Sequence, residues 1–148
     1  MKKIIPFFLV LFCLANLGSC KQKLNVPSAV QEAFEQKFLN TQDAVWEYDS
    51  ENNLWEVEFL IDETELSAVF NADSEWMETE MDIPFSELPQ MIQDALNTDY
   101  PDYNIEELEW IENPEGVFYE VDFALDNAGE ESELEILFAS DGSVVLEK

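Results

Sequence analysis

Histidine and arginine are absent from this chain of 148 residues, and cysteine occurs only twice. Without histidine, the chain cannot use an imidazole as an acid–base catalyst or as a metal ligand. Six lysines stand against 34 aspartates and glutamates, which gives a formal net charge of −28 at pH 7. A nucleic-acid-binding protein needs clustered basic residues to displace phosphate counterions, so the charge excludes nucleic acid as a partner. Cationic partners are favoured instead, mainly through faster encounter.

Long apolar runs are also absent, except at the N-terminus. Two lysines, Lys2 and Lys3, follow the initiator methionine. Residues 4–17 are almost entirely apolar, and small residues precede Cys20. This order predicts a secretory signal peptide over residues 1–19, which is too short to span a bilayer as a stable helix. The segment Leu17-Gly18-Ser19-Cys20 resembles the lipobox of bacterial lipoproteins, in which the cysteine carries the lipid. Cys13 would leave with the signal peptide, so the mature domain would hold no further thiol.

The lipobox predicts how the mature protein is held. Lipoprotein cysteines usually carry two or three acyl chains, and two or more give stable anchoring. Residues 20–25 would form a tether of at most about 18 Å, so the domain would lie close to the bilayer. Lys21 rather than an aspartate follows the cysteine, so we expect an exported lipoprotein at the outer membrane, facing the periplasm. The membrane is therefore a predicted partner through the lipid on Cys20.

Two segments of the mature chain match each other in their helical pattern. Residues 26–34 align with residues 88–96, and each begins with an apolar residue followed by proline. Proline is well tolerated at a helix start because its missing N–H would have no partner there. The apolar positions that match at helical spacing are Val30, Ala33, Phe34 and Phe38 in the first segment and Ile92, Ala95, Leu96 and Tyr100 in the second.

The strand patterns match as well. Residues 55–59 align with residues 119–123, and both alternate apolar with acidic side chains. This period of two is typical of a strand with one buried face. We therefore predict an α+β fold that is a tandem repeat, over residues 26–81 and 82–148, of one helix plus about four antiparallel strands, with the helices packed on one sheet face. The short linker predicts one compact unit, and the sequence leaves open whether the sheets merge.

The chain resembles the PepSY-like family of Bacteroidota envelope proteins, also described as β-lactamase-inhibitor-like, over about residues 26–148. The resemblance rests on a lipobox followed by V-P-x-x-V-x-x-A-F, W-E-V-E-F and F-N-x-D, and then by L-P-x-x-I-x-x-A-L, Y-E-V-D-F and F-x-x-D-G. It implies tandem helix-plus-antiparallel-strand units, export and no established enzymatic activity. These motifs are structural, so they identify a fold better than a function.

Aromatic residues offer one candidate contact site. Tryptophan and tyrosine dominate protein-interface hot spots, but they also fill cores. The acidic neighbours of Trp55 and Tyr119 place those two rings in the core. Trp76 is followed by acidic residues at 78 and 80, and its counterpart in the second copy is the small Val144. We therefore predict Trp76 as an exposed partner-binding residue.

The acidic positions of the alternating strands offer a second candidate. These residues should point away from the core, and we predict a partner contact at Glu56, Glu58, Glu120 and Asp122. Directly opposed carboxylates destabilise a sheet unless something offsets them, and a cationic surface or loosely bound Ca²⁺ or Mg²⁺ would do so. The simpler interpretation, which we favour, is a solvated face on which water and salt screen the repulsion.

No catalytic arrangement is visible. Among 34 acids, some pairs will stand at the separation used by glycosidases by chance alone. Serine and threonine have no evident base beside them. Acidic residues near 126–131 do not have the spacing of an EF-hand loop, so we predict no metal site and no cofactor.

The sequence thus predicts a non-catalytic envelope lipoprotein that binds an unknown envelope protein, with an inhibitor-like role as one form of that binding. The alternative is a binder of divalent cations or cationic peptides through the acidic sheet face. High salt should weaken binding by that face far more than binding by an aromatic patch. The identity of the partner and the oligomeric state stay open.

Overall fold

The computed structural model describes residues 24–124 and 133–147. The predicted signal peptide, the lipidation site Cys20 and most of the tether lie outside the described residues, as does the acidic segment 126–131. The helices and strands are, in chain order, α1 (Ser28–Lys37), β1 (Gln42–Asp49), β2 (Leu54–Ile61), β3 (Thr64–Asn71), β4 (Trp76–Asp82), the short 3-10 helix η1 (Phe85–Glu87), α2 (Gln90–Asp99), β5 (Asn104–Asn113), β6 (Gly116–Ala124), β7 (Glu133–Ala139) and β8 (Val144–Glu147).

All eight strands belong to one antiparallel sheet, and each strand pairs with the next in sequence order from β1 to β8. The central pairing joins β4 to β5, with Met81 opposite Trp110. The predicted fold class, a tandem repeat of helix-plus-four-strand units, is therefore wrong. The protein is mainly one continuous sheet with two ten-residue helices. The physical reason is that β4 and β5 would each be an unpaired sheet edge in separate units, and pairing them satisfies both rows of backbone groups.

Each helix starts at a proline, as the sequence predicts. The carbonyl of Pro27 accepts hydrogen bonds from the N–H groups of Val30 and Gln31, both at 3.1 Å. A glutamine side chain secures the start, since Gln31 Nε2 donates to the carbonyl of Val26 at 3.0 Å. In α2, Gln93 Nε2 donates in the same way to the carbonyl of Leu88 at 2.8 Å. These bonds fix where each helix enters, and so which side chains it turns toward the sheet.

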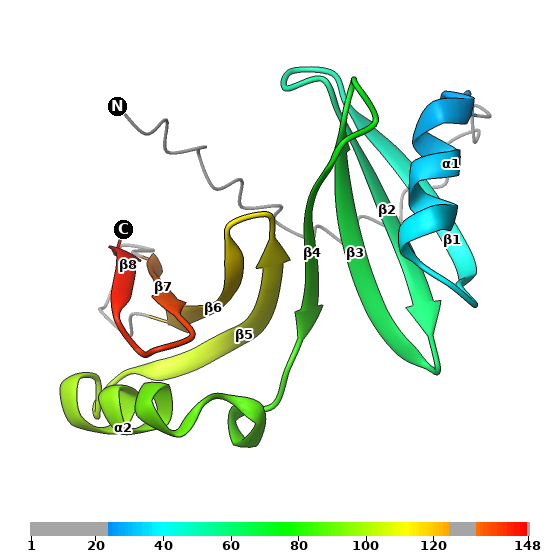
Figure 1. Cartoon of the computed structure of the whole chain (residues 1–148). Coiled ribbons are helices and arrows are strands. Elements are labelled where there is room, and N and C mark those ends of the chain that lie inside the picture. The colour runs from blue at the N-terminus through cyan, green and yellow to red at the C-terminus, as the bar shows by residue number, and fades with distance from the viewer. Residues whose placement is uncertain (1–23, 125–132, 148) are drawn as a thin grey trace.

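The two helices cover different parts of the same side of the sheet. α1 packs on β1–β4 and α2 packs on β5–β7, and the two halves of the sheet bend away from each other between β4 and β5 (Figure 1). Burial of Val57 and Phe59 confirms the alternation predicted for β2. Two separate clusters result. The first contains Val30, Phe34, Val57, Phe59, Ala68 and Phe70, and the second contains Ile83, Leu88, Ile92, Leu96, Val121, Phe123, Ile136 and Phe138.

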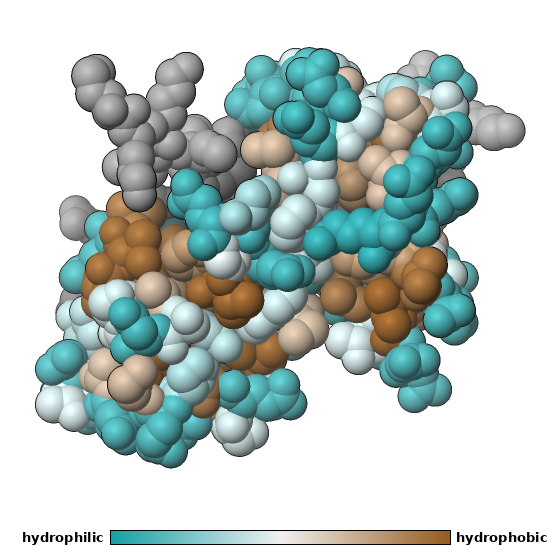
Figure 2. Space-filling model, viewed as in Figure 1, coloured by the Kyte–Doolittle hydropathy of each residue, from teal (hydrophilic) through white to brown (hydrophobic). Residues whose placement is uncertain are grey.

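Apolar surface follows the same division. In the view of Figure 2, hydrophobic surface lies in separate patches over the two halves, and more hydrophilic residues lie between them. The continuity between the halves thus comes from backbone pairing of β4 with β5 rather than from one shared core.

Candidate functional site

The side of the sheet opposite α1 and α2 carries many carboxylate side chains. In an antiparallel sheet, directly opposed residues point to the same side. Ala68 and Thr79 are opposed and face the helices, whereas the neighbouring pair Ser67 and Glu80 faces the other way. Following the register across the sheet places acids of strands from β1 to β7 on this side, Glu47, Glu65 and Asp82 among them. We use the name acid face for the surface around nine of these acids: Glu56, Glu58, Glu78, Glu80, Glu107, Glu109, Glu120, Asp122 and Glu135.

The register places several of these acids directly opposite one another. Glu109 of β5 is paired with Glu120 of β6, and Asp122 is paired with both Glu107 and Glu135. Side chains in such pairs have Cβ atoms about 4.5–5.5 Å apart, and like charges at that distance destabilise a sheet. The centre of this face therefore brings carboxyl groups together in pairs that do not stabilise the folded sheet.

The four acids predicted from sequence all lie on the acid face. Glu56 and Glu58 come from β2, and Glu120 and Asp122 come from β6. Three strands separate these pairs, so at about 4.8 Å per strand spacing they stand roughly 19 Å apart. The two pairs therefore lie at opposite sides of one extended surface and do not form one compact site.

The sequence analysis missed the acids between these two pairs. Glu78 and Glu80 on β4 and Glu109 on β5 bring the acid face together across its middle. The alternation of acids at 78 and 80, and again at 107 and 109, was the signal that could have found them. That alternation indicates one continuous acidic surface only when β4 and β5 are known to be neighbouring strands.

Part of this surface is buried, so the expectation of a solvated face is wrong for Glu120 among the four predicted acids. Glu80 is 9% exposed and Glu120 only 2% exposed. Burial, followed by repulsion from nearby Glu78 and Glu109, raises the pKa of Glu80 to about 9. Burial likewise raises the pKa of Glu120 to about 9, with Glu135 as the next cause. Both side chains therefore favour the neutral acid form at neutral pH.

Three further acids also have raised pKa values, by a smaller amount. Burial raises the pKa values of Glu56, Glu78 and Glu109 to about 7, and for Glu56 and Glu109 neighbouring carboxylates add to the rise. The Ser67 hydroxyl, opposite Glu80 on β3, donates a hydrogen bond to its carboxyl. The charge on this face thus depends on pH in the neutral range, and on any cation that reaches it.

A groove runs among the carboxylates of β2 to β5 and has a volume of about 250 Å³. Its lining comes from β2 through β5 and is dominated by acids. The residues that line it are Glu56, Glu58, Thr64, Glu65, Leu66, Ser67, Glu80, Met81, Asp82, Glu107 and Glu109. A groove of this composition offers many hydrogen-bond acceptors beside the apolar side chains of Leu66 and Met81, so it suits a ligand that carries hydrogen-bond donors.

Two sets of three carboxylates come close enough to share a cation. One set is Asp82, Glu107 and Glu109, and the other is Glu120, Asp122 and Glu135; within each, one oxygen from each residue lies within 4.8 Å of the others. Calcium takes six to eight oxygen ligands, so each set would need several waters or further groups to complete a site. These sets are the geometric basis for the divalent-cation alternative.

Trp76 is not where the sequence placed it. The ring is half-buried and packs against the cluster under α1, on the opposite side of the sheet from the acid face. A shift in the β3–β4 register between Val69 and Phe70 pairs Phe70 with Trp76 and turns the ring toward the helix. The expectation of an exposed side chain is therefore wrong, and a role for Trp76 in binding a partner stays a prediction.

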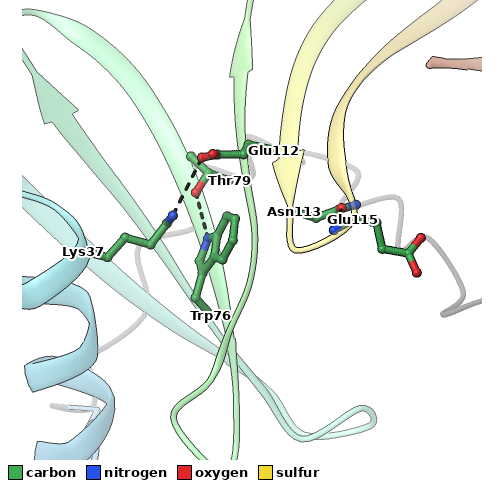
Figure 3. A network of polar contacts seen from close by, with 6 residues as sticks. All are labelled: Lys37, Trp76, Thr79, Glu112, Asn113 and Glu115. Atoms are coloured by element: carbon green, nitrogen blue, oxygen red, sulfur yellow. Dashed lines mark hydrogen bonds and ion pairs between the residues drawn. The ribbon is translucent and has the colours of Figure 1, made fainter. Parts of the chain in front are cut away.

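A small polar network holds Trp76 in place (Figure 3). Its indole Nε1 donates to Thr79 Oγ1 at 2.9 Å. Lys37, at the end of α1, has its Nζ 3.3 Å from the centre of the tryptophan ring and 3.7 Å from Glu112 Oε2 on β5. The lysine thus joins the helix of the first half to a strand of the second. It is the only basic residue within 24–124 and 133–147.

We expect Lys37→Met to lower the free energy of unfolding by about 1–2 kcal/mol, because it removes a cation–π contact and a partly exposed ion pair while keeping an apolar stem. Urea denaturation measures the change. Lys37→Arg is the matched control and should lose less than half as much. Equal stability of Lys37→Met and the parent would show that the lysine does not help to join the halves.

Comparisons with known proteins agree with this geometry. The family described as "Putative beta-lactamase-inhibitor-like, PepSY-like" matches residues 55–145. No curated protein matches the chain. Among solved structures, a DUF2874 family protein from Bacteroides uniformis has a TM-score of 0.75 at 18% identity, covering 84% of this chain and 89% of that one. A BLIP-like protein from Bacteroides fragilis has a TM-score of 0.74 at 19% identity, covering 86% and 88%.

A third solved structure shares the fold. It is described as a putative periplasmic protein from Bacteroides eggerthii, with a TM-score of 0.73 at 20% identity over 84% of this chain and 88% of that one. Likenesses at such identities establish the shared fold alone. Neither helix of the described residues has the length and apolar character that crossing a membrane requires.

Proposed function

Because the chain belongs to the PepSY-like, β-lactamase-inhibitor-like family, which is not a known family of enzymes, we propose that it binds another protein without catalysing a reaction, and that it does so through the acid face. One observation carries the proposal. Carboxylates that are opposed in register and largely buried, such as Glu120 against Glu109, stand on the side of the sheet that α1 and α2 leave uncovered. A partner surface that offsets this charge explains an arrangement that otherwise only destabilises the sheet.

The proposal extends to location. The sequence N-terminal to the described residues supports a periplasmic lipoprotein, with lipid on Cys20 holding the domain at the outer membrane. An anchored domain searches a thin layer next to the membrane, which raises the effective concentration of any partner in that layer. An inhibitor-like role, in which the acid face covers a working surface of the partner, is the form of binding that the family description supports.

Capture from native envelopes tests the proposal. We expect the lipidated protein to recover a partner by crosslinking, and the double variant Glu80→Gln/Glu109→Gln to lose most of it. Glutamine keeps the size of each side chain and cannot add charge repulsion to the sheet, so the loss could not be attributed to unfolding. The control is Glu32→Gln/Glu35→Gln, which makes the same two substitutions on exposed positions of α1, away from the acid face. Equal recovery by both double variants would contradict binding at this face.

The second candidate function is binding of divalent cations by the two sets of three carboxylates. It predicts that Ca²⁺ or Mg²⁺ titrated into the protein alone gives saturable heat at stoichiometric amounts in calorimetry, and that Glu120→Gln abolishes one site. Saturable binding of Ca²⁺, together with recovery of no partner from envelopes, would favour this alternative over protein binding.

A further inference from the structure

The groove on the acid face is elongated rather than compact. Its lining acids come from four neighbouring strands, with Glu58 on β2 at one side and Glu109 on β5 at the other. At about 4.8 Å per strand spacing, this is a span of roughly 14 Å across the strands. A single metal ion gathers its ligands at 2.3–2.6 Å from one point, so it can use only a small part of such a surface.

An unpartnered acid next to the groove points to a donor that is still missing. Glu120 stands directly opposite Glu109, which lines the groove, and it is only 2% exposed. Within residues 24–124 and 133–147, its Oε2 atom has no hydrogen-bond partner. A buried acceptor without a partner is costly, and more so for a group that can carry charge. A ligand that brings a hydrogen-bond donor to this position would remove that cost.

Resting on the protein-binding function proposed above, we propose that the acid face binds an extended basic segment of the partner, which crosses the strands from β2 toward β6 and places lysine or arginine side chains at alternate positions among the carboxylates. Lysine and arginine are donors only, which matches a surface of acceptors. Alternate residues of an extended chain point to the same side about 6.6–7 Å apart. Three such residues therefore cover about the span of the groove and reach the Glu109–Glu120 pair.

The volume of the groove agrees with this occupant. The groove has a volume of about 250 Å³, far more than the one probe sphere of about 10–15 Å³ that a single water needs. It can admit the ends of two or three long side chains, whereas a lone ion would leave most of it to solvent.

Binding of a basic segment to the acid face should release protons. The pKa values of Glu56 and Glu109 are raised to about 7 and that of Glu120 to about 9, mainly by burial. A bound cation favours the ionised carboxylate and lowers these pKa values again. Binding near neutral pH is therefore coupled to loss of protons, and it should tighten as the pH rises from about 6 to about 9, because fewer protons then have to leave.

Calorimetry on the lipidated full chain in neutral detergent tests the inference. The probe is a capped peptide of seven residues in which three lysines alternate with threonines. A neutral peptide with glutamine in place of lysine controls for backbone binding, and a peptide with three contiguous lysines controls for charge alone. We expect the alternating peptide to bind at least tenfold more tightly than either control, with proton release seen as a difference in heat between two buffers of different ionisation enthalpy.

Variants locate the site. Glu109→Gln/Glu120→Gln should weaken the alternating peptide by roughly tenfold or more, the effect expected for losing a hydrogen bond to a charged group. Glu32→Gln/Glu35→Gln on α1 should leave its affinity unchanged. Equal binding of the alternating and contiguous peptides, or equal effects of the two double variants, would overturn the inference. So would binding without proton release.

The inference and the proposed function can fail separately. If the protein captures a partner through the acid face but the alternating peptide does not bind, the extended basic segment is wrong and protein binding stands. If Glu80→Gln/Glu109→Gln captures as much partner as the parent and the peptide does not bind either, both are wrong.

Discussion

Raising the pH from about 5 to about 9 should destabilise this protein by several kcal/mol. The cause is the set of buried acids on the acid face, whose pKa values in the folded state are about 7 for Glu78 and Glu109 and about 9 for Glu80 and Glu120. In the unfolded chain a glutamate has a pKa near 4.5. Between these values the folded state holds protons that the unfolded state has released, so the free energy of unfolding falls as the pH rises.

The sign of this effect follows from the direction of the shifts. Stabilisation by these groups is fully present below the unfolded pKa, is lost as the pH rises through the folded values, and is gone above about 9. Each unit of pKa difference corresponds to about 1.4 kcal/mol. Thermal melts at constant ionic strength measure the dependence, and the midpoint should drop steadily between about pH 5 and pH 9.

Glu120→Gln separates this mechanism from general charge repulsion. Glutamine keeps the shape of the side chain but cannot ionise, so the variant should match the parent near pH 5 and be more stable near pH 9. Glu32→Gln, on the exposed side of α1, is the control and should leave the slope unchanged. Parallel profiles for the parent and for Glu120→Gln would show that burial of this carboxyl does not control the pH dependence.

Phe34→Ala should be among the most destabilising single substitutions in the chain, with a loss of about 3–5 kcal/mol. Phe34 is 4% exposed and is the point where α1 meets the sheet. Its ring lies 5.0 Å from that of Phe59 and 5.3 Å from that of Trp46, in both cases edge to face. Truncation removes these contacts and leaves a cavity that the strands cannot close, because backbone pairing fixes their spacing.

Urea denaturation tests this prediction. The urea concentration at the midpoint should fall, while the slope of the free energy of unfolding against urea concentration stays unchanged. Leu39→Ala is the matched control: Leu39 is 71% exposed, so removing a similar apolar group there should change stability by less than about 0.5 kcal/mol. If Phe34→Ala costs less than about 1 kcal/mol, α1 does not depend on this residue for its packing.

The acid face could be predicted in part from the sequence and in part not. Alternation of apolar and acidic residues places Glu56 and Glu120 away from the core, because side chains on a strand alternate between its two sides. The sequence does not reveal that Glu109 stands opposite Glu120, or that burial raises the pKa values of both. Those properties depend on which strands are neighbours and how the sheet bends between its halves.

Trp76 shows a second limit. Strict alternation with Glu78 and Glu80 would place the ring on the acid face, but the irregular register beside Phe70 turns it to the helix side. A β-bulge inserts one residue and so exchanges the two sides of a strand from that point on. Residue patterns carry little warning of such an insertion, because it depends on how two backbones fit together.

The sequence by itself determined the positions of the two helices, the buried sides of β2 and β6, and the family of this protein. Period-two and helical patterns sufficed because they reflect which side of a strand or helix is buried, a property of neighbouring residues. Only the tertiary structure decided that eight strands form one sheet, because β4 and β5 pair through backbone groups that every residue carries alike. The same pairing brings the acids of both halves together, so the candidate site also belongs to the tertiary structure.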